Sequence, residues 1–204
     1  CPFILRLEEM VLKTRIVLAS KSPRREALLR GLELPCELEV VPADIDESCY
    51  QMSVPRAQAA VLSVVKAQAV AQQYPLSIVI GADTVVELDG VMMGKPKDEA
   101  QAREMLTALS DKTHTVHTGI ALCCRGEVFS DVVSSRVTFR ALEPEEIDRY
   151  IASGEPFDKA GGYGIQGRAA TMVRAIDGDY FAVMGLPLCR LSELLRQHFD
   201  IWLL

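Results

Sequence analysis

The chain has 204 residues, of which 49% are hydrophobic, and its 22 basic and 28 acidic side chains give a formal net charge of −6 at pH 7. This length predicts one domain or two closely packed lobes, and the acidic balance argues against nucleic acid or an anionic membrane as a partner. No apolar run reaches the length of a membrane span, and the start has no signal-peptide layout. We therefore expect a cytoplasmic protein.

Apolar periodicity and turn residues predict strands and helices that alternate in the first half of the chain. Strands are expected at 15–19, 36–41, 78–80, 84–88, 91–93, 115–124, 128–139 and 172–176, and helices at 23–30, 53–73, 99–109, 144–152 and 188–199. In the first helix, Ala27, Leu28 and Leu32 are expected to face inward. The early elements resemble crossover units, whereas the later hairpins indicate antiparallel strands. The predicted fold class is α/β, with a mixed, twisted central sheet and flanking helices.

The first candidate site lies where the first strand meets the first helix. Ser22 suits an N-cap and Pro23 the first helical position. Arg24 and Arg25 then fall in the first turn, where the helix dipole disfavours cations. Together with Ser20, these groups suggest a cradle of N–H, hydroxyl and guanidinium donors for a phosphate. The alternative is two solvated arginines on an ordinary helix.

Two further candidates follow strands in the middle of the chain. Asp83 comes after the core strand 78–80 and a Gly-Ala pair, at a strand end where α/β proteins place ligands. It suits a general base or a ligand of a divalent cation, although an aspartate that caps a turn would give the same pattern. Lys95 precedes a proline on a bent loop and suits a phosphate, without a Walker A motif. An exposed turn lysine is its alternative.

Acidic and basic residues before Asp83 extend this set. Asp46 and Glu47 lie in an acidic loop after a strand, where they suit a hard cation together with phosphate oxygens. Lys66 lies in the long helix among Ala and Val and suits a phosphate or a snorkelling position. A solvated surface is the alternative for all three residues.

A glycine-rich loop lies late in the chain. Gly162, Gly164 and Gly167 fit GxGxxG, but no strand precedes them, which excludes a dinucleotide fold on context. Tyr163 and Gln166 within the loop suggest backbone that approaches a flat ligand, with the Gln166 amide at a base edge. A flexible connector is the alternative.

The histidines and cysteines point to no metal or nucleophile site. The six cysteines lack a CxxC motif and a zinc-like spacing, which predicts buried thiols in a reducing compartment. His114 and His117 are expected to be ordinary strand or turn residues, because nothing in the sequence pairs them with a nucleophilic Ser or Cys.

Taken together, the motifs resemble those of the Maf proteins, a family of nucleoside triphosphate pyrophosphatases. In chain order they are Ala-Ser-x-Ser-Pro-Arg-Arg (19–25), Gly-Ala-Asp-Thr (81–84), Lys-Pro (95–96), His-x-Val-x-Thr-Gly (114–119), Gly-Glu-Pro-x-Asp-Lys-Ala-Gly-x-Tyr-Gly-Ile-Gln-Gly (154–167) and Gly-Leu-Pro (185–187). The resemblance spans roughly residues 15 to 195. It leaves 1–14 as an N-terminal extension and 15–204 as a single Maf-type domain.

The resemblance implies two lobes that enclose a cleft, as in Maf and ITPase-like proteins. It implies metal-dependent hydrolysis of dTTP or UTP, and of modified pyrimidine nucleotides, to the monophosphate and pyrophosphate, as nucleotide-pool house-cleaning. Asp83 matches the catalytic proton acceptor, and Glu47 with Asp83 would hold Mg²⁺ or Mn²⁺. Arg24, Thr84 and Gln166 match positions that mark the dTTP and UTP branch. Other predicted substrate-binding residues are Ser20, Ser22, Arg25, Lys66, Lys95, Asp158 and Lys159. A homodimer is also implied.

Two other functions remain open from the sequence. One is a nucleotide-binding regulator of septum formation and cell division that keeps the cleft without catalysis. The other is a nucleic-acid-binding protein, against which the net charge of −6 argues.

Overall fold

The computed structural model describes residues 15–204, so the predicted extension 1–14 lies outside the described residues. A seven-stranded sheet forms its centre, with strand order β2-β1-β3-β5-β6-β7 and β4 paired to β3. The strands are β1 (Ile16–Leu18), β2 (Leu38–Val40), β3 (Ile78–Leu88), β4 (Val91–Met93), β5 (Thr113–Cys124), β6 (Glu127–Phe139) and β7 (Val173–Asp177). β1 is parallel to β2 and β3, whereas every other pair is antiparallel. The predicted mixed sheet is confirmed.

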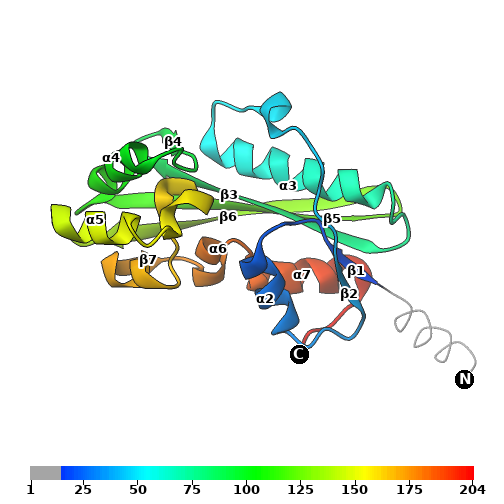
Figure 1. Cartoon of the computed structure of the whole chain (residues 1–204). Helices are drawn as coiled ribbons and strands as arrows, with labels where there is room; N and C mark the ends of the chain where they lie inside the picture. Colours follow the sequence, from blue (N-terminus) through cyan, green and yellow to red (C-terminus); the bar gives the residue numbers. More distant parts are fainter. Residues whose placement is uncertain (1–14) are drawn as a thin grey trace, which may run out of the picture.

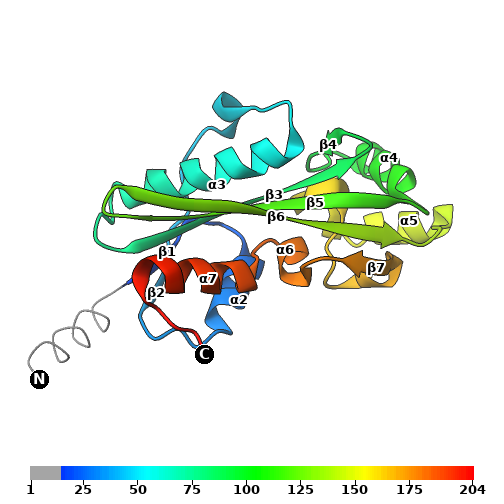
Figure 2. The ribbon, with the colours of Figure 1, turned by 180° about the vertical axis from the view of Figure 1, so that it is seen from behind.

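Helices cover both faces of this sheet. They are α2 (Pro23–Arg30), α3 (Pro55–Ala71), α4 (Glu99–Leu109), α5 (Pro144–Ile151), α6 (Tyr180–Met184) and α7 (Leu188–Phe199), with short 3-10 turns η1 (Glu47–Tyr50), η2 (Glu155–Asp158), η3 (Ala160–Gly162) and η4 (Arg168–Met172). Helix α3 lies on one face, and α2, α6 and α7 lie on the other (Figure 1). In Figure 2, which views the molecule from behind, α7 runs beneath the long strands. The turns η1 to η4 and α6 were not predicted, because none shows a full amphipathic period.

Three apolar clusters fill the spaces between these layers. One lies between β1, β3, β5 and the helices α2 and α7, with Ile80 and Leu191 fully buried. A second lies beneath α3. The third lies at the far end, where α4 and α5 pack on the strands around Leu106 and Phe139. The long strands β3, β5 and β6 therefore connect two lobes, one near β1 and one near α4 and α5 (Figure 1).

Two glycines let α3 approach the sheet closely. A Cβ atom on Gly81 would lie 2.2 Å from the Ser63 carbonyl oxygen, and one on Gly119 would lie 2.1 Å from the Ala59 carbonyl oxygen. Such distances are far inside van der Waals contact, so larger residues would push the helix away. The glycine of the Gly-Ala-Asp-Thr motif thus serves helix packing.

Several local predictions are wrong or only partly correct. Residues 78–88 form one continuous strand, because β5 pairs with β3 across the expected break at Asp83. In α2 it is Leu29 that is fully buried, while Ala27 is exposed. Cys49 and Cys189 are exposed rather than buried. No helix within residues 15–204 is both long and apolar enough to cross a membrane.

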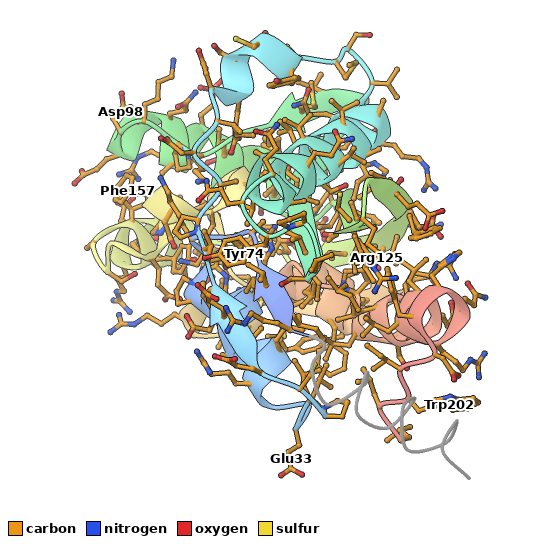
Figure 3. The ribbon with its side chains drawn as sticks, turned by 90° about the vertical axis from the view of Figure 1, so that its right-hand side faces the viewer. Glu33, Tyr74, Asp98, Arg125, Phe157 and Trp202 are labelled. Carbon is orange, nitrogen blue, oxygen red and sulfur yellow. The ribbon has the colours of Figure 1, made fainter. Side chains whose placement is uncertain are left out.

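Side chains at the periphery project away from the packed layers. Figure 3 shows Glu33, in the connection between α2 and β2, and Trp202, in the C-terminal segment, pointing outward. Trp202 is 61% exposed.

Candidate active site

A cleft of about 730 Å³ opens between the start of α2, the middle of β3, the β4 hairpin and the glycine-rich loop. Every residue that the sequence predicted for substrate, metal or catalysis through the family resemblance lines it. These residues are Ser20, Ser22, Arg24, Arg25, Glu47, Lys66, Asp83, Thr84, Lys95, Asp158, Lys159 and Gln166. Segments that are distant in the chain therefore meet in one place.

The start of α2 forms one wall of the cleft. Ser22 caps the helix as predicted, since its Oγ accepts from the Arg25 N–H at 3.4 Å. The Arg25 side chain turns back and donates from Nε to the Gly185 carbonyl oxygen at 2.7 Å and from a terminal nitrogen to Thr84 Oγ1 at 3.0 Å. A third, longer contact reaches Ser20 Oγ at 3.4 Å. All these acceptors are neutral, so within residues 15–204 no carboxylate pairs directly with the guanidinium.

The half-buried position of Arg25 affects its charge. Removal from water lowers its pKa, against the favourable charge of the nearby Asp83. A half-buried cation held only by neutral oxygens is costly unless an anion joins it. Arg25 is therefore the clearest anion anchor of the cleft.

The floor of the cleft carries a carboxylate pair around one ammonium. Lys66, from α3, donates from Nζ to Asp83 Oδ1 at 2.6 Å and pairs with Glu47 Oε1 at 2.8 Å. Asp83 is only 9% exposed. Burial raises the pKa of Asp83, while the charges of Lys66 and Arg25 oppose that rise. A buried carboxyl with a raised pKa beside cations is the arrangement that general bases use.

The glycine-rich loop forms the opposite wall. Arg24 reaches across to Asp158 Oδ2 at 3.3 Å, and Lys159 donates to the Glu155 carbonyl oxygen at 2.7 Å and to Asp158. Burial acts to raise the pKa of Asp158, but the hydrogen bond and charge of Lys159 and the charge of Arg24 outweigh it, so that pKa is lowered. Arg24 is thus already paired.

Two predicted residues reach the cleft from exposed positions. Lys95 follows the β4 hairpin, and Gln166 lies in the glycine-rich loop. The loop lies between 3-10 turns, with no strand before it, which agrees with the exclusion of a dinucleotide motif.

Asp46, which was predicted to bind a cation, does not line the cleft. Its Oδ1 atom instead accepts hydrogen bonds from the backbone N–H and the hydroxyl of Ser48, at 3.0 and 2.6 Å. It caps the turn η1. Only its neighbour Glu47 reaches the floor.

Sequence reasoning also missed residues that hold Arg25 in place. The Thr84 hydroxyl lies 3.0 Å from Thr118 Oγ1, which in turn donates to the Ala182 carbonyl oxygen at 2.7 Å. Thr118 and Gly185 belong to the quoted motifs but had been assigned no role. Their only signal was their place in those motifs, since the contacts join residues 34 to 160 positions apart.

The Glu47 and Asp83 carboxylates could supply part of the oxygen ligands that a hard divalent cation needs. Glu47 and Asp83 both reach the same ammonium, so both can turn toward one centre, and carboxylate oxygens suit Mg²⁺. Within residues 15–204 no group of three or more His, Cys, Asp or Glu side chains could hold a metal. A cation would therefore need further oxygens from a bound ligand and from water, as Mg²⁺ commonly does.

The mixed sheet and this cationic cleft around a buried carboxylate define an α/β protein with a cleft suited to a polyanion. The chain belongs to the Maf family, because the family described as "Maf-like protein" matches residues 15–198. A dTTP/UTP pyrophosphatase of Moorella thermoacetica is 47% identical over 93% of this chain and 98% of its own. The dTTP/UTP pyrophosphatase of Bacillus cytotoxicus is 48% identical over 91% and 96%. A HAM1 protein from Coxiella burnetii has a TM-score of 0.46 and 22% identity over 62% of this chain and 73% of its own.

Proposed function

We propose that this chain hydrolyses nucleoside triphosphates, with dTTP and UTP as preferred substrates, to the monophosphate and pyrophosphate. The observation that carries the proposal is the buried Asp83 carboxylate beside Lys66, on the floor of a cleft that also holds Arg24 and Arg25. The names of the relatives support the choice of substrates.

Charge explains why a triphosphate suits this cleft. The protein as a whole is acidic, with a net charge of −6, so a polyanion needs local cations. Arg25 offers its charge directly, while Arg24, Lys66 and Lys95 line the same space. Guanidinium groups bind phosphate oxygens in a planar, bidentate way and stabilise charge that develops on a transferring phosphoryl group.

Asp83 would act as the general base. Its ionised carboxylate would take a proton from a water molecule that attacks the triphosphate chain at the α–β anhydride. The broken bond leaves pyrophosphate on one side and the nucleoside monophosphate on the other. The Lys66 ammonium holds the carboxylate in place and favours its ionised form.

Mg²⁺ or Mn²⁺ would be held by Glu47 and Asp83, together with phosphate oxygens. When bound, such a cation neutralises charge on the phosphate oxygens. Lys66 already brings both carboxylates to one point.

Selection of a pyrimidine would fall to Arg24, Thr84 and Gln166. The Thr84 hydroxyl is fixed by Arg25 and Thr118, so its position is rigid. The Gln166 amide is exposed in the loop that lines the cleft and offers both a donor and an acceptor to a base edge. Substitutions at these positions should alter base preference more than folding. Unchanged relative rates across nucleotides would remove their selective role.

A screen for pyrophosphate release tests the function. The purified chain is incubated with dTTP, UTP, dCTP, dATP and modified pyrimidine triphosphates, with Mg²⁺, with Mn²⁺ and with a chelator. We expect fastest release from dTTP and UTP, and loss of release with the chelator. Nucleotide binding without release under any condition would favour the regulator of septum formation instead.

The cellular setting is part of the same proposal. We propose action on the free nucleotide pool of the cytoplasm by a homodimer. Light scattering on the purified chain measures the oligomeric state, and a monomer at micromolar concentration would contradict the homodimer.

A further inference from the structure

Outside the cleft, Glu87, His117 and Ser134 form a hydrogen-bonded row across three neighbouring strands. His117 Nε2 lies 2.7 Å from Glu87 Oε2, and His117 Nδ1 lies 2.7 Å from Ser134 Oγ. The expectation that no serine pairs with His117 is wrong, because the antiparallel register of β5 and β6 sets Ser134 directly opposite it. None of the three residues is among those that line the cleft.

Chemistry fixes the direction of each hydrogen bond when the imidazole is neutral. The ionised Glu87 carboxylate can only accept, so His117 Nε2 carries the proton and Nδ1 is left as an acceptor. Ser134 must then donate its hydroxyl proton to Nδ1. Arg56, at the start of α3, donates to the same Ser134 oxygen at 2.9 Å, which leaves that proton free to point at the imidazole.

These hydrogen-bond directions match those among a nucleophile, a general base and a carboxylate that orients the base. The hydroxyl gives its proton to a histidine whose other nitrogen is held by a carboxylate, as in hydrolases with a serine nucleophile. His117 is 7% exposed, so the base is shielded from water, whereas Ser134 is exposed. A reagent can therefore reach the oxygen while the proton acceptor stays buried.

The surroundings of Ser134 supply a positive charge and access from solvent. The Arg56 guanidinium lies 2.9 Å from the Ser134 oxygen, close enough to stabilise the negative charge that develops on the ester carbonyl oxygen when Ser134 attacks. Ser134 itself is exposed, so a small ester can reach its oxygen from solvent.

We propose that Ser134, His117 and Glu87 form a second hydrolytic site that cleaves small esters. Ser134 Oγ bonds to the ester carbonyl carbon while its proton passes to His117 Nδ1. The bond from that carbon to the alcohol oxygen then breaks, and the leaving alcohol takes the proton from Nδ1. Water next attacks the acyl-serine, gives one proton to Nδ1, and releases the carboxylic acid as Ser134 regains its proton.

Labelling with a fluorophosphonate, followed by peptide mapping, tests this site in the full chain. We expect one adduct, on Ser134, and none there in Ser134→Ala. His117→Gln should slow labelling about a hundredfold, because it removes the base. Ser130→Ala is the matched control: Ser130 is exposed on the same strand and face, but its register partner is Ala121. It should label at the wild-type rate.

A second measurement distinguishes loss of the serine site from loss of folding. Hydrolysis of 4-nitrophenyl acetate and release of pyrophosphate from dTTP are followed in each variant. Ser134→Ala should lose ester hydrolysis and keep pyrophosphate release, since Ser134 lies outside the cleft. The proposal is wrong if the wild type labels no faster than Ser134→Ala or if the adduct lies on another residue. The two activities are measured separately, so failure of one leaves the other intact.

Discussion

The Nζ atom of Lys66 and the Oδ1 atom of Asp83 lie 2.6 Å apart on the floor of the cleft. Helix α3 carries the lysine and strand β3 carries the aspartate, so their separation depends on how closely the helix packs on the sheet. Both side chains are nearly buried, with 13% and 12% exposed. The pair therefore links helix packing to the protonation of the proposed base.

The pH dependence of hydrolysis should report on this pair. Burial raises the pKa of Asp83 above 3.8. Since only the ionised carboxylate acts as a base, the rate should fall with decreasing pH around a midpoint above that value. Lys66→Gln removes an opposing positive charge, so the midpoint should move to higher pH, whatever happens to the maximal rate.

The control for that profile is Lys95→Gln. Lys95 lines the same cleft from an exposed position, so its loss should weaken substrate binding and leave the midpoint in place. A Lys66→Gln midpoint equal to or below that of the wild type would contradict the role of the pair.

Displacing α3 should also raise the pH midpoint of hydrolysis. A Cβ atom at position 119 would lie 2.1 Å from the Ala59 carbonyl oxygen, and Gly119 is the register partner of Asp83. Gly119→Ala should push α3 outward, lower the free energy of unfolding by about 1–3 kcal/mol and move the pH midpoint upward, as Lys66→Gln does. Thermal unfolding and the pH–rate profile measure both effects.

Gly31→Ala is the matched glycine control. A Cβ atom there meets its nearest neighbour at 3.4 Å, and the residue has an ordinary right-handed conformation. In Gly31→Ala the stability should not fall and the pH midpoint should not rise. If Gly119→Ala behaved like this control, the close approach of α3 would not govern the pair.

The ion pair between Arg24 and Asp158 should favour product release. Asp158 competes with phosphate oxygens for Arg24, so Asp158→Asn should free the arginine and tighten binding of pyrophosphate. An exposed pair is worth up to about 1 kcal/mol, which corresponds to an inhibition constant lower by about two- to fivefold. Asp177→Asn, which removes an exposed partner of Arg136 outside the cleft, is the control. Weaker inhibition in Asp158→Asn would oppose this account.

Acid stability should depend on His114. Its Nε2 lies 2.7 Å from the Tyr163 hydroxyl, its Nδ1 has no partner among the described residues, and burial lowers its pKa from 6.5 to about 4. Between these values the unfolded chain binds the proton more readily, so stability falls as pH decreases from 6.5 to 4.

The size of that loss follows from the shift. His114 should contribute about 3 kcal/mol of it, since each pKa unit is worth about 1.4 kcal/mol. Urea unfolding at several pH values would show a shallower decline for His114→Gln than for the wild type. Parallel curves would show that this histidine does not titrate in the way described.

Local sequence patterns predicted most of the fold. Residues 23–30 and 188–199 are helices with the predicted bounds, because capping residues and apolar spacing act over neighbouring positions. The break expected at residues 81–83 is absent for a reason that local patterns do not contain. The strand continues because β5 pairs with it, and Gly81 admits α3 instead. Pairing between distant segments decides such cases.

For the site, too, the sequence predicted the residues but not the contacts between distant segments. The family resemblance identified residues of the cleft, including Asp83, Lys66 and Arg25, yet gave none of their contacts. The link from Arg25 to the Gly185 carbonyl crosses 160 positions, and the serine opposite His117 depends on strand register. Neither relation leaves a local pattern in the sequence.

The most direct test of the central claim is pyrophosphate release by Asp83→Asn, measured alongside nucleotide binding. Asn keeps the size of the side chain and a hydrogen-bond acceptor for Lys66 but loses the basic carboxylate. We expect release from dTTP to fall about a thousandfold, within the range for loss of a general base, while a slowly hydrolysed dTTP analogue still binds. Release near the wild-type rate would contradict the account.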